Sequence, residues 1–125
     1  MAKGCPCGRD ATYDECCGAV HRGVKAAATA EALMRSRYSA FAVGDTAYLL
    51  RSWHSRTRPY EVSLDRGVRW TGLDVLSTTG GSAFHSEGTV EFRAFFRAGG
   101  RVGEQYELSR FCREDGAWVY LDGTV

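Results

Sequence analysis

Four of the five cysteines of this chain stand in one short segment, and this grouping constrains the fold more than any other feature. They form two pairs: Cys5 and Cys7 with a proline between them, and the neighbours Cys16 and Cys17. Adjacent cysteines rarely bond to each other, so disulfides would have to join one pair to the other. Two such bridges in so short a segment would be crowded.

A metal ion explains the spacing better. Four thiolates arriving in two pairs can complete the tetrahedron that zinc prefers, with bonds of about 2.3 Å. The chain shows no apolar signal segment, which predicts a cytoplasmic protein in reducing surroundings that favour thiolates over disulfides. The alternative is a metal-free or redox-active cluster, but the segment lacks a Cys-x-x-Cys pair. The sequence therefore predicts a Zn²⁺ site made of Cys5, Cys7, Cys16 and Cys17, with His21 as an alternative fourth ligand. Either set closes the site to water, so this zinc would be structural.

The next segment has the pattern of a helix. Thr29 is a suitable N-cap and Gly44 a suitable C-terminal stop. Apolar residues between them share one face at helical spacing: Ala30, Leu33, Met34, Tyr38 and Phe41. Asp45 can cap a second, shorter helix from Thr46 to Ser52.

The rest of the chain alternates as strands do. Strands are expected over 68–77, 88–97, 104–113 and 117–122, with turns at Gly99-Gly100 and Asp115-Gly116. A linker at 78–81 would separate the first two strands. Helices followed by an antiparallel meander predict the α+β class, with the helix that carries Leu33 covering one face of the sheet.

Two arginines stand where apolar residues are expected. Arg37 falls inside the apolar stripe of the first helix, and Arg110 shares a strand face with Tyr106, Leu108 and Cys112. A guanidinium is rarely buried without a partner. One interpretation is an internal ion pair with Glu91, Glu107 or Asp122; another is a pocket that binds an anion; a third lets one arginine reach solvent.

Other features narrow the function without naming it. Trp53 and His54 follow the second helix, where site residues are common, and His54 is a candidate acid or base. The formal net charge of +1 argues against a nucleic-acid partner. No apolar run reaches the length of about 18 residues that a membrane span needs. Phosphate-binding, hydrolase and zinc-protease motifs are missing from the sequence.

The chain resembles a known family in two parts. The segment from Cys5 to Gly18 resembles the SEC-C motif, a small zinc knuckle in which Cys-x-Cys and a Cys-Cys or Cys-His pair hold the metal. Four further runs resemble the YchJ family of small bacterial proteins in the same order: 33–41, 48–54, 107–111 and 118–123.

The resemblance implies two domains: a SEC-C-like zinc knuckle over 1–24 and a nuclear transport factor two-like α+β domain over 25–125. In that fold, helices pack into a cone formed by a curved antiparallel sheet, and Arg37 and Arg110 would both point into the cone. The resemblance implies no particular reaction, because both enzymes and binding proteins have this fold. The first hypothesis is a non-enzymatic adapter whose knuckle binds a protein partner. The alternative is a small-molecule-binding protein, or an enzyme of lyase or isomerase type, that holds an anionic ligand in the cone pocket with Arg37, Arg110, Trp53 and His54.

Overall fold

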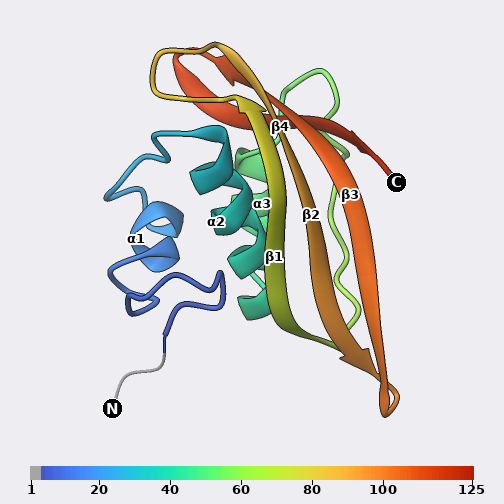
Figure 1. Cartoon of the computed structure of the whole chain (residues 1–125). Coiled ribbons are helices and arrows are strands. Elements are labelled where there is room, and N and C mark those ends of the chain that lie inside the picture. The colour runs from blue at the N-terminus through green and yellow to red at the C-terminus, as the bar shows by residue number, and fades with distance from the viewer. Residues whose placement is uncertain (1–3) are drawn as a thin grey trace.

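A computed structural model describes residues 4–125 (Figure 1). Three helices precede four strands: α1 (Cys17–His21), α2 (Ala30–Val43) and α3 (Thr46–Arg51), then β1 (Val68–Gly80), β2 (Glu87–Ala98), β3 (Arg101–Glu114) and β4 (Ala117–Thr124). The strands form one antiparallel sheet in the order β1-β2-β3-β4. The predicted α+β class and meander are confirmed.

Helix α2 forms where its end signals place it. The Thr29 hydroxyl accepts a hydrogen bond from the Ala32 N–H over 3.0 Å, and Gly44 ends the helix in the left-handed conformation at φ 82°. Asp45 caps α3 by accepting from the Tyr48 N–H. Both caps agree with the sequence prediction because cap chemistry depends on neighbouring residues alone.

Helix α2 lies between the N-terminal segment and the sheet (Figure 1). Its apolar stripe packs on inward-facing residues of three elements and forms the main core: Ala30, Leu33 and Met34 with Val90, Phe111 and Trp118. Its other side is small and polar, with Ser36 and Ser39 completely buried toward the N-terminal segment. The apolar stripe predicted the contact with the sheet; nothing in it predicted the second contact.

The two short hairpin turns are as predicted. Gly99 and Gly100 have φ of 58° and 80°, and Asp115 and Gly116 have φ of 53° and 85°. Positive φ at both central residues defines the turn that matches the twist of the flanking strands. Both turns therefore fix the register, with Ala98 opposite Arg101 and Glu114 opposite Ala117.

The expected linker at 78–81 is wrong. Strand β1 continues through it to Gly80, which pairs with Gly88, and the connection runs over 81–86 instead. A Cβ on Gly81 would lie 2.8 Å from the Cβ of Ala30, and the Ala30 N–H donates to the Gly81 carbonyl over 2.9 Å. The glycines here allow the start of α2 to approach the sheet; they do not break the strand.

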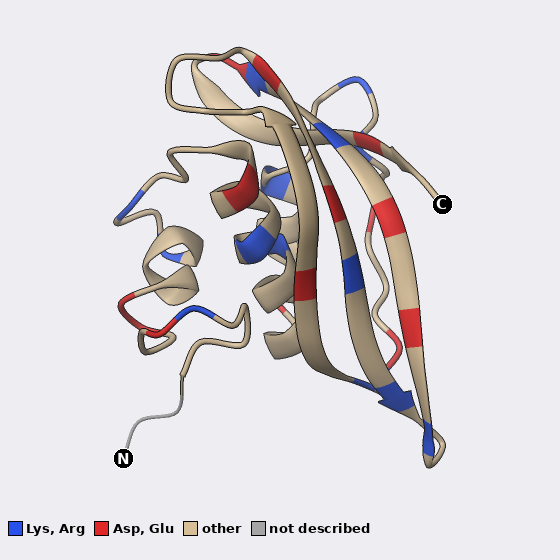
Figure 2. Ribbon diagram, in the orientation of Figure 1, with Lys and Arg blue, Asp and Glu red and all other residues tan. Residues whose placement is uncertain are grey.

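The expected boundary between knuckle and main domain, at 24/25, falls in the connector between α1 and α2. Residues 1–3 of the expected knuckle lie outside the described residues. The described part, residues 4–24, is called the knuckle below. No helix in the described chain is long and apolar enough to cross a membrane. Figure 2 shows that basic and acidic residues are interspersed over the helices and strands.

Candidate metal centre and interior pocket

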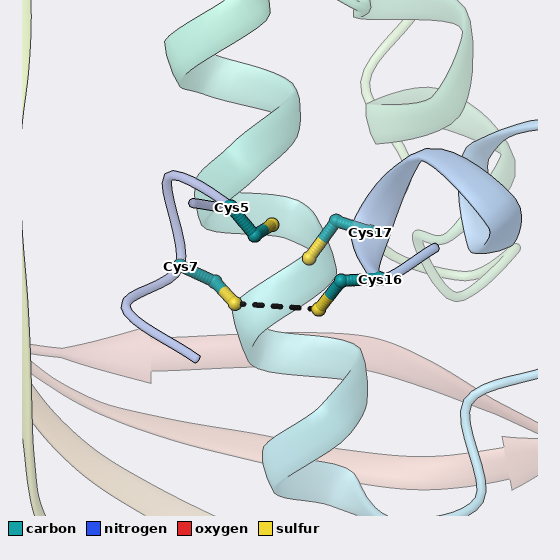
Figure 3. A group of neighbouring side chains, drawn as sticks. All are labelled: Cys5, Cys7, Cys16 and Cys17. Carbon is teal, nitrogen blue, oxygen red and sulfur yellow. Dashed lines mark hydrogen bonds between the residues drawn. The ribbon is translucent and has the colours of Figure 1, made fainter. Parts of the chain in front are cut away.

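The four N-terminal cysteines converge on one point (Figure 3). Cys5 and Cys7 come from the first loop, and Cys16 and Cys17 from the start of α1. Their sulfur atoms all lie within 4.8 Å of one another, and the Sγ atoms of Cys7 and Cys16 are 3.7 Å apart. Four bonds of about 2.3 Å at tetrahedral angles place sulfurs about 3.8 Å apart. None of these cysteines forms a disulfide, and the donor set fits a metal ion.

Backbone turns bring the two pairs together. The Cys5 N–H donates to the Ala11 carbonyl over 2.7 Å, and the Gly8 N–H donates to the Cys5 carbonyl over 3.1 Å. Gly8 has φ 93°, a backbone conformation that residues other than glycine rarely adopt. The first pair therefore sits in a tight turn that these hydrogen bonds close.

The thiols perturb one another. A hydrogen bond from the Cys17 thiol lowers the pKa of Cys7 to about 5. Burial raises the pKa of Cys16 to about 11, and the hydrogen bond to Cys7, together with burial, raises the pKa of Cys17 strongly. Like charges so close cannot all ionise unaided. A bound cation would supply the charge that lets four thiolates coexist, so the cluster suits a metal better than free thiols.

His21 lies near the cluster but serves another role. Its Nε2 donates to the Ser36 carbonyl over 2.7 Å, and its Nδ1 accepts from the Tyr13 hydroxyl over 2.7 Å. This tautomer is inferred from the partners, because a carbonyl can only accept. With both ring nitrogens engaged, His21 joins α1 to α2, and the structure brings Cys17 into the sulfur cluster in its place.

The cluster is packed against α2. Arg35 donates from Nη1 to the Cys7 carbonyl over 2.6 Å and pairs through Nε with Glu31 at 2.9 Å. The Sγ of Cys5 lies 3.5 Å from the Ser39 hydroxyl oxygen. Cys5, Cys7 and Cys17 are buried in consequence. A metal ion here would bind at the contact between the knuckle and α2.

A cavity of about 200 Å³ lies on the other side of α2, toward the sheet. Its walls are mostly aromatic, and its polar residues come mainly from α2, β3 and β4. It is lined by Met34, Arg37, Tyr38, Phe41, Trp53, Trp70, Phe92, Ala94, Gln105, Glu107, Ser109, Phe111 and Tyr120. An apolar cavity with a few convergent polar groups is the usual form of a small-molecule site.

Arg37 is the cationic group of this cavity and is 6% exposed. Its Nη1 donates to the Leu49 carbonyl over 2.8 Å and to the Ser52 hydroxyl over 2.7 Å. Its guanidinium carbon lies 4.9 Å from the ring centre of Trp53 and 4.6 Å from that of Tyr120. Burial lowers the pKa of Arg37 to about 10, which leaves it protonated at neutral pH. The predicted burial of Arg37 is found, and within residues 4–125 it pairs with no carboxylate.

Glu107 is the anionic group of the cavity. Its Oε1 accepts from the Tyr120 hydroxyl over 3.1 Å, and its Oε2 accepts from the Ser109 hydroxyl over 2.8 Å. Burial raises the pKa of Tyr120, with the Glu107 charge adding to the effect. Sequence reasoning named Glu107 only as an ion-pair partner. Its position two residues before Ser109 and four before the apolar Phe111 is the signal that places it on the inner face.

Arg110 does not point into the cone, so that expectation is wrong. The inner face of β3 carries Ser109 and Phe111, so Arg110 faces outward, with 61% of its side chain exposed. Its Nε and Nη2 bind the two carboxylate oxygens of Asp122 at 2.7 and 2.6 Å, and this hydrogen bonding raises the pKa of Arg110. Asp122 is one of the predicted partners, but the pair lies on the surface.

Trp53 and His54 separate at the end of α3. Trp53 lines the cavity, and its buried Nε1 has no hydrogen-bond partner in the described residues. His54 turns away from the cavity: its Nδ1 accepts from the Arg56 N–H over 3.0 Å, and its Nε2 lies 3.8 Å from a Glu114 carboxylate oxygen. The structure does not bring His54 together with Arg37.

Comparisons with known proteins agree with this architecture. The family model for the middle NTF2-like domain of YchJ matches residues 29–123. A UPF0225 protein of Streptomyces coelicolor is 61% identical over 95% of this chain and 93% of its own. A UPF0225 protein of Corynebacterium glutamicum is 54% identical over 100% of this chain and 99% of its own.

Two solved structures have the same fold. The solution structure of a SEC-C motif containing protein from Rhodopseudomonas palustris has a TM-score of 0.84 and 34% identity, and covers 100% of this chain and 98% of that one. The crystal structure of a SEC-C motif containing protein from Psychrobacter arcticus has a TM-score of 0.76 and 28% identity, and covers 97% of this chain and 81% of that one. The predicted resemblance is confirmed, and the chain belongs to the YchJ family, which carries the name UPF0225 in these relatives.

Proposed function

We propose that this protein is a zinc-stabilised binding protein that holds a small anionic molecule in the cavity between α2 and the sheet. The observation that carries the proposal is Arg37: a protonated guanidinium, 6% exposed, lines the cavity without a carboxylate partner among residues 4–125. A buried charge is costly unless it is compensated. Leu49, Ser52, two aromatic rings and the charge of Glu107 in the same cavity compensate it in part, and an anionic ligand bound directly to the guanidinium would complete the compensation.

The metal in this proposal is zinc. Four thiolates at tetrahedral spacing are the donor set of structural zinc sites, and a four-ligand site leaves no open position for water or substrate. Cys5, Cys7, Cys16 and Cys17 would hold the ion, whose role is to fix the knuckle on α2. Metal analysis of the purified chain should find one zinc ion per chain, removable by a chelator.

The adapter role remains a prediction from the resemblance. A protein partner that binds the knuckle would meet its exposed loop, which carries Arg9, Asp10, Asp14 and Glu15. The cysteines themselves face α2, which favours a stabilising role for the metal over a role in partner binding. A pull-down that compares wild type with Cys16→Ser separates the two roles, because only the adapter role requires a partner that is lost with the metal.

The cavity is tested directly with small anions. We would titrate the zinc-loaded full chain with benzoate, phenyl phosphate and toluenesulfonate, and follow amide and indole resonances by NMR. Binding should shift the Trp53 and Trp70 indole signals, and Arg37→Gln should abolish the shifts. Arg110→Gln removes an equal charge from the outer face and should leave them unchanged. If amide and indole signals do not shift with any of the three anions at millimolar concentration, the proposal is wrong.

A further inference from the structure

One edge of the Arg37 guanidinium is uncommitted. Both hydrogen bonds of this side chain to described residues come from Nη1, to Leu49 and Ser52. The Nε–H and the two Nη2–H donors have no acceptor within residues 4–125. Nε and Nη2 lie on the same side of a guanidinium and form a two-pronged donor. The anchored side of Arg37 thus leaves its two-pronged side free.

Arg110 shows what this edge binds in the same protein. Its Nε and Nη2 donate to the two oxygens of the Asp122 carboxylate at 2.7 and 2.6 Å. The match is geometric, because a planar carboxylate presents two oxygens at the spacing of the two donors. The same edge of Arg37 has the same complementarity, but in a buried site where the interaction is less screened by water.

The free edge is also held in place. The Arg37 guanidinium carbon lies 4.9 and 4.6 Å from the ring centres of Trp53 and Tyr120, which contact each other edge to face, and Nη1 donates to a backbone carbonyl of α3. A ligand would therefore not have to immobilise this side chain, which lowers the entropy cost of binding.

Glu107 restricts which ligands fit. Each of its carboxylate oxygens accepts one hydrogen bond, from Tyr120 or Ser109, and a carboxylate oxygen can accept about two. The group can thus accept a further bond from a ligand hydroxyl or ammonium. Its negative charge also disfavours a doubly charged ligand such as a phosphate dianion.

The walls set the shape and size. Tyr38, Phe41, Trp70, Phe92 and Phe111 line the cavity with aromatic surface. Its volume of about 200 Å³ lies below the roughly 300–1,000 Å³ of sites for drug-sized molecules. A ligand with a single flat ring would fit both the aromatic walls and the small volume.

We propose that the pocket selects a small planar monocarboxylate that also carries a hydrogen-bond donor, with the carboxylate on the Nε/Nη2 edge of Arg37 and the donor on Glu107. This inference rests on the proposed binding function and names its ligand class. Hydroxybenzoates are the simplest members of that class.

The first test uses wild-type, zinc-loaded protein and calorimetric titration. The probes are benzoate, 3- and 4-hydroxybenzoate, benzamide and phenyl phosphate. We expect one hydroxybenzoate isomer to bind about tenfold more tightly than benzoate, because its hydroxyl would donate a hydrogen bond to the charged Glu107 carboxylate. Benzamide and phenyl phosphate should bind at least tenfold more weakly than benzoate. In NMR spectra the Arg37 Nε–H resonance should move downfield with benzoate and stay in place with benzamide.

Variants test which protein residue binds each end of the ligand. Arg37→Lys keeps the charge but loses the fork, and should weaken benzoate binding at least tenfold. Glu107→Gln should reduce the preference for benzoate over phenyl phosphate. Arg110→Gln is the matched control and should bind every probe as wild type does. If Arg37→Lys fails to fold, the Arg37 Nε–H resonance of wild type still decides the point.

The outcomes separate this inference from the proposed function. Phenyl phosphate binding as tightly as benzoate, or no advantage for either hydroxybenzoate, would overturn the ligand class while leaving an anion-binding pocket. Absence of binding by every probe would overturn both.

Discussion

The Arg35 guanidinium donates to the Cys7 carbonyl across 2.6 Å and so fastens the cysteine cluster to helix α2. The same side chain pairs with Glu31 one turn earlier, and only 17% of it is exposed. One arginine of α2 thereby connects the loop that carries Cys7 to the helix.

Removal of this link should loosen the metal site. We expect Arg35→Gln to lower the free energy of unfolding by about 1–3 kcal/mol, because a charge-assisted hydrogen bond to a partly buried carbonyl is lost. Zinc release to a chelator should be faster as well. Urea unfolding and chelator kinetics measure the two effects. Arg93→Gln is the control: its pair with Glu104 is about half exposed, so its loss should change stability by less than about 0.5 kcal/mol. Equal effects of both substitutions would contradict the role given to Arg35.

The fourth ligand can be settled by a pair of substitutions. Cys17→Ser should abolish stoichiometric zinc, whereas His21→Asn should keep the zinc and lose stability, because both ring nitrogens of His21 bind protein groups. Metal analysis after gel filtration gives the stoichiometry, and thermal unfolding gives the stability. Cys112→Ser, which alters the one cysteine outside the cluster, should keep its zinc. The reverse result, with zinc kept by Cys17→Ser and lost by His21→Asn, would make His21 the ligand.

Gly88 is a position where even a methyl group should not fit. A Cβ there would lie 2.5 Å from the Cα of Gly81, which is backbone and cannot turn aside. Gly88→Ala should therefore destabilise the protein by at least about 2 kcal/mol more than Gly100→Ala. Gly100 has φ 80° with nothing within 4 Å, so its substitution reports backbone strain without a clash. Chemical unfolding of both variants tests the difference, and equal losses would show that the sheet yields at Gly88.

The pair of Arg110 and Asp122 should give an acid-dependent contribution to stability. The Arg110 guanidinium lowers the pKa of Asp122 in the folded protein, so the folded state favours the ionised carboxylate. This contribution is complete above the unfolded pKa of about 3.9 and is lost as pH falls through the lower folded pKa. Asp122→Asn should thus be less stable than wild type at pH 7, and the two should converge near pH 2. High salt should shrink the difference, because both side chains are exposed. A difference that persists unchanged at pH 2 would point to another cause.

The sequence correctly predicted the helix ends and turns that depend on the chemistry of neighbouring residues. Thr29, Gly44 and Asp45 define helix ends through their own hydrogen bonds or backbone angles, and Gly99-Gly100 defines a turn. The grouping of the four cysteines was predicted because a metal site would need its ligands together. Such features depend on residues close together in the chain.

The predictions of the end of β1 and of the orientation of Arg110 were wrong, because contacts between residues far apart in the chain determine both. β1 continues to Gly80, where it pairs with Gly88, and the next residue, Gly81, approaches Ala30 of α2; no local pattern shows these distant contacts. Arg110 stands on a strand face with Tyr106 and Leu108, which looks apolar in sequence, yet in the structure that face is the outer one. Two apolar residues on a solvent face are ordinary, so apolar character alone cannot tell the inside of a sheet from the outside.

Helix α2 has no free side along most of its length. No residue from Ala30 to Phe41 is fully exposed, since the knuckle covers one flank and the sheet and cavity the other. Each substitution in this stretch must suit two neighbours of different chemistry at once, polar backbone on one flank and aromatic rings on the other. A library of random variants selected for folding should therefore retain fewer changes in this helix than in β2 or β3, which carry exposed residues such as Arg93, Tyr106 and Arg110. Engineering of the protein would best begin on those strands.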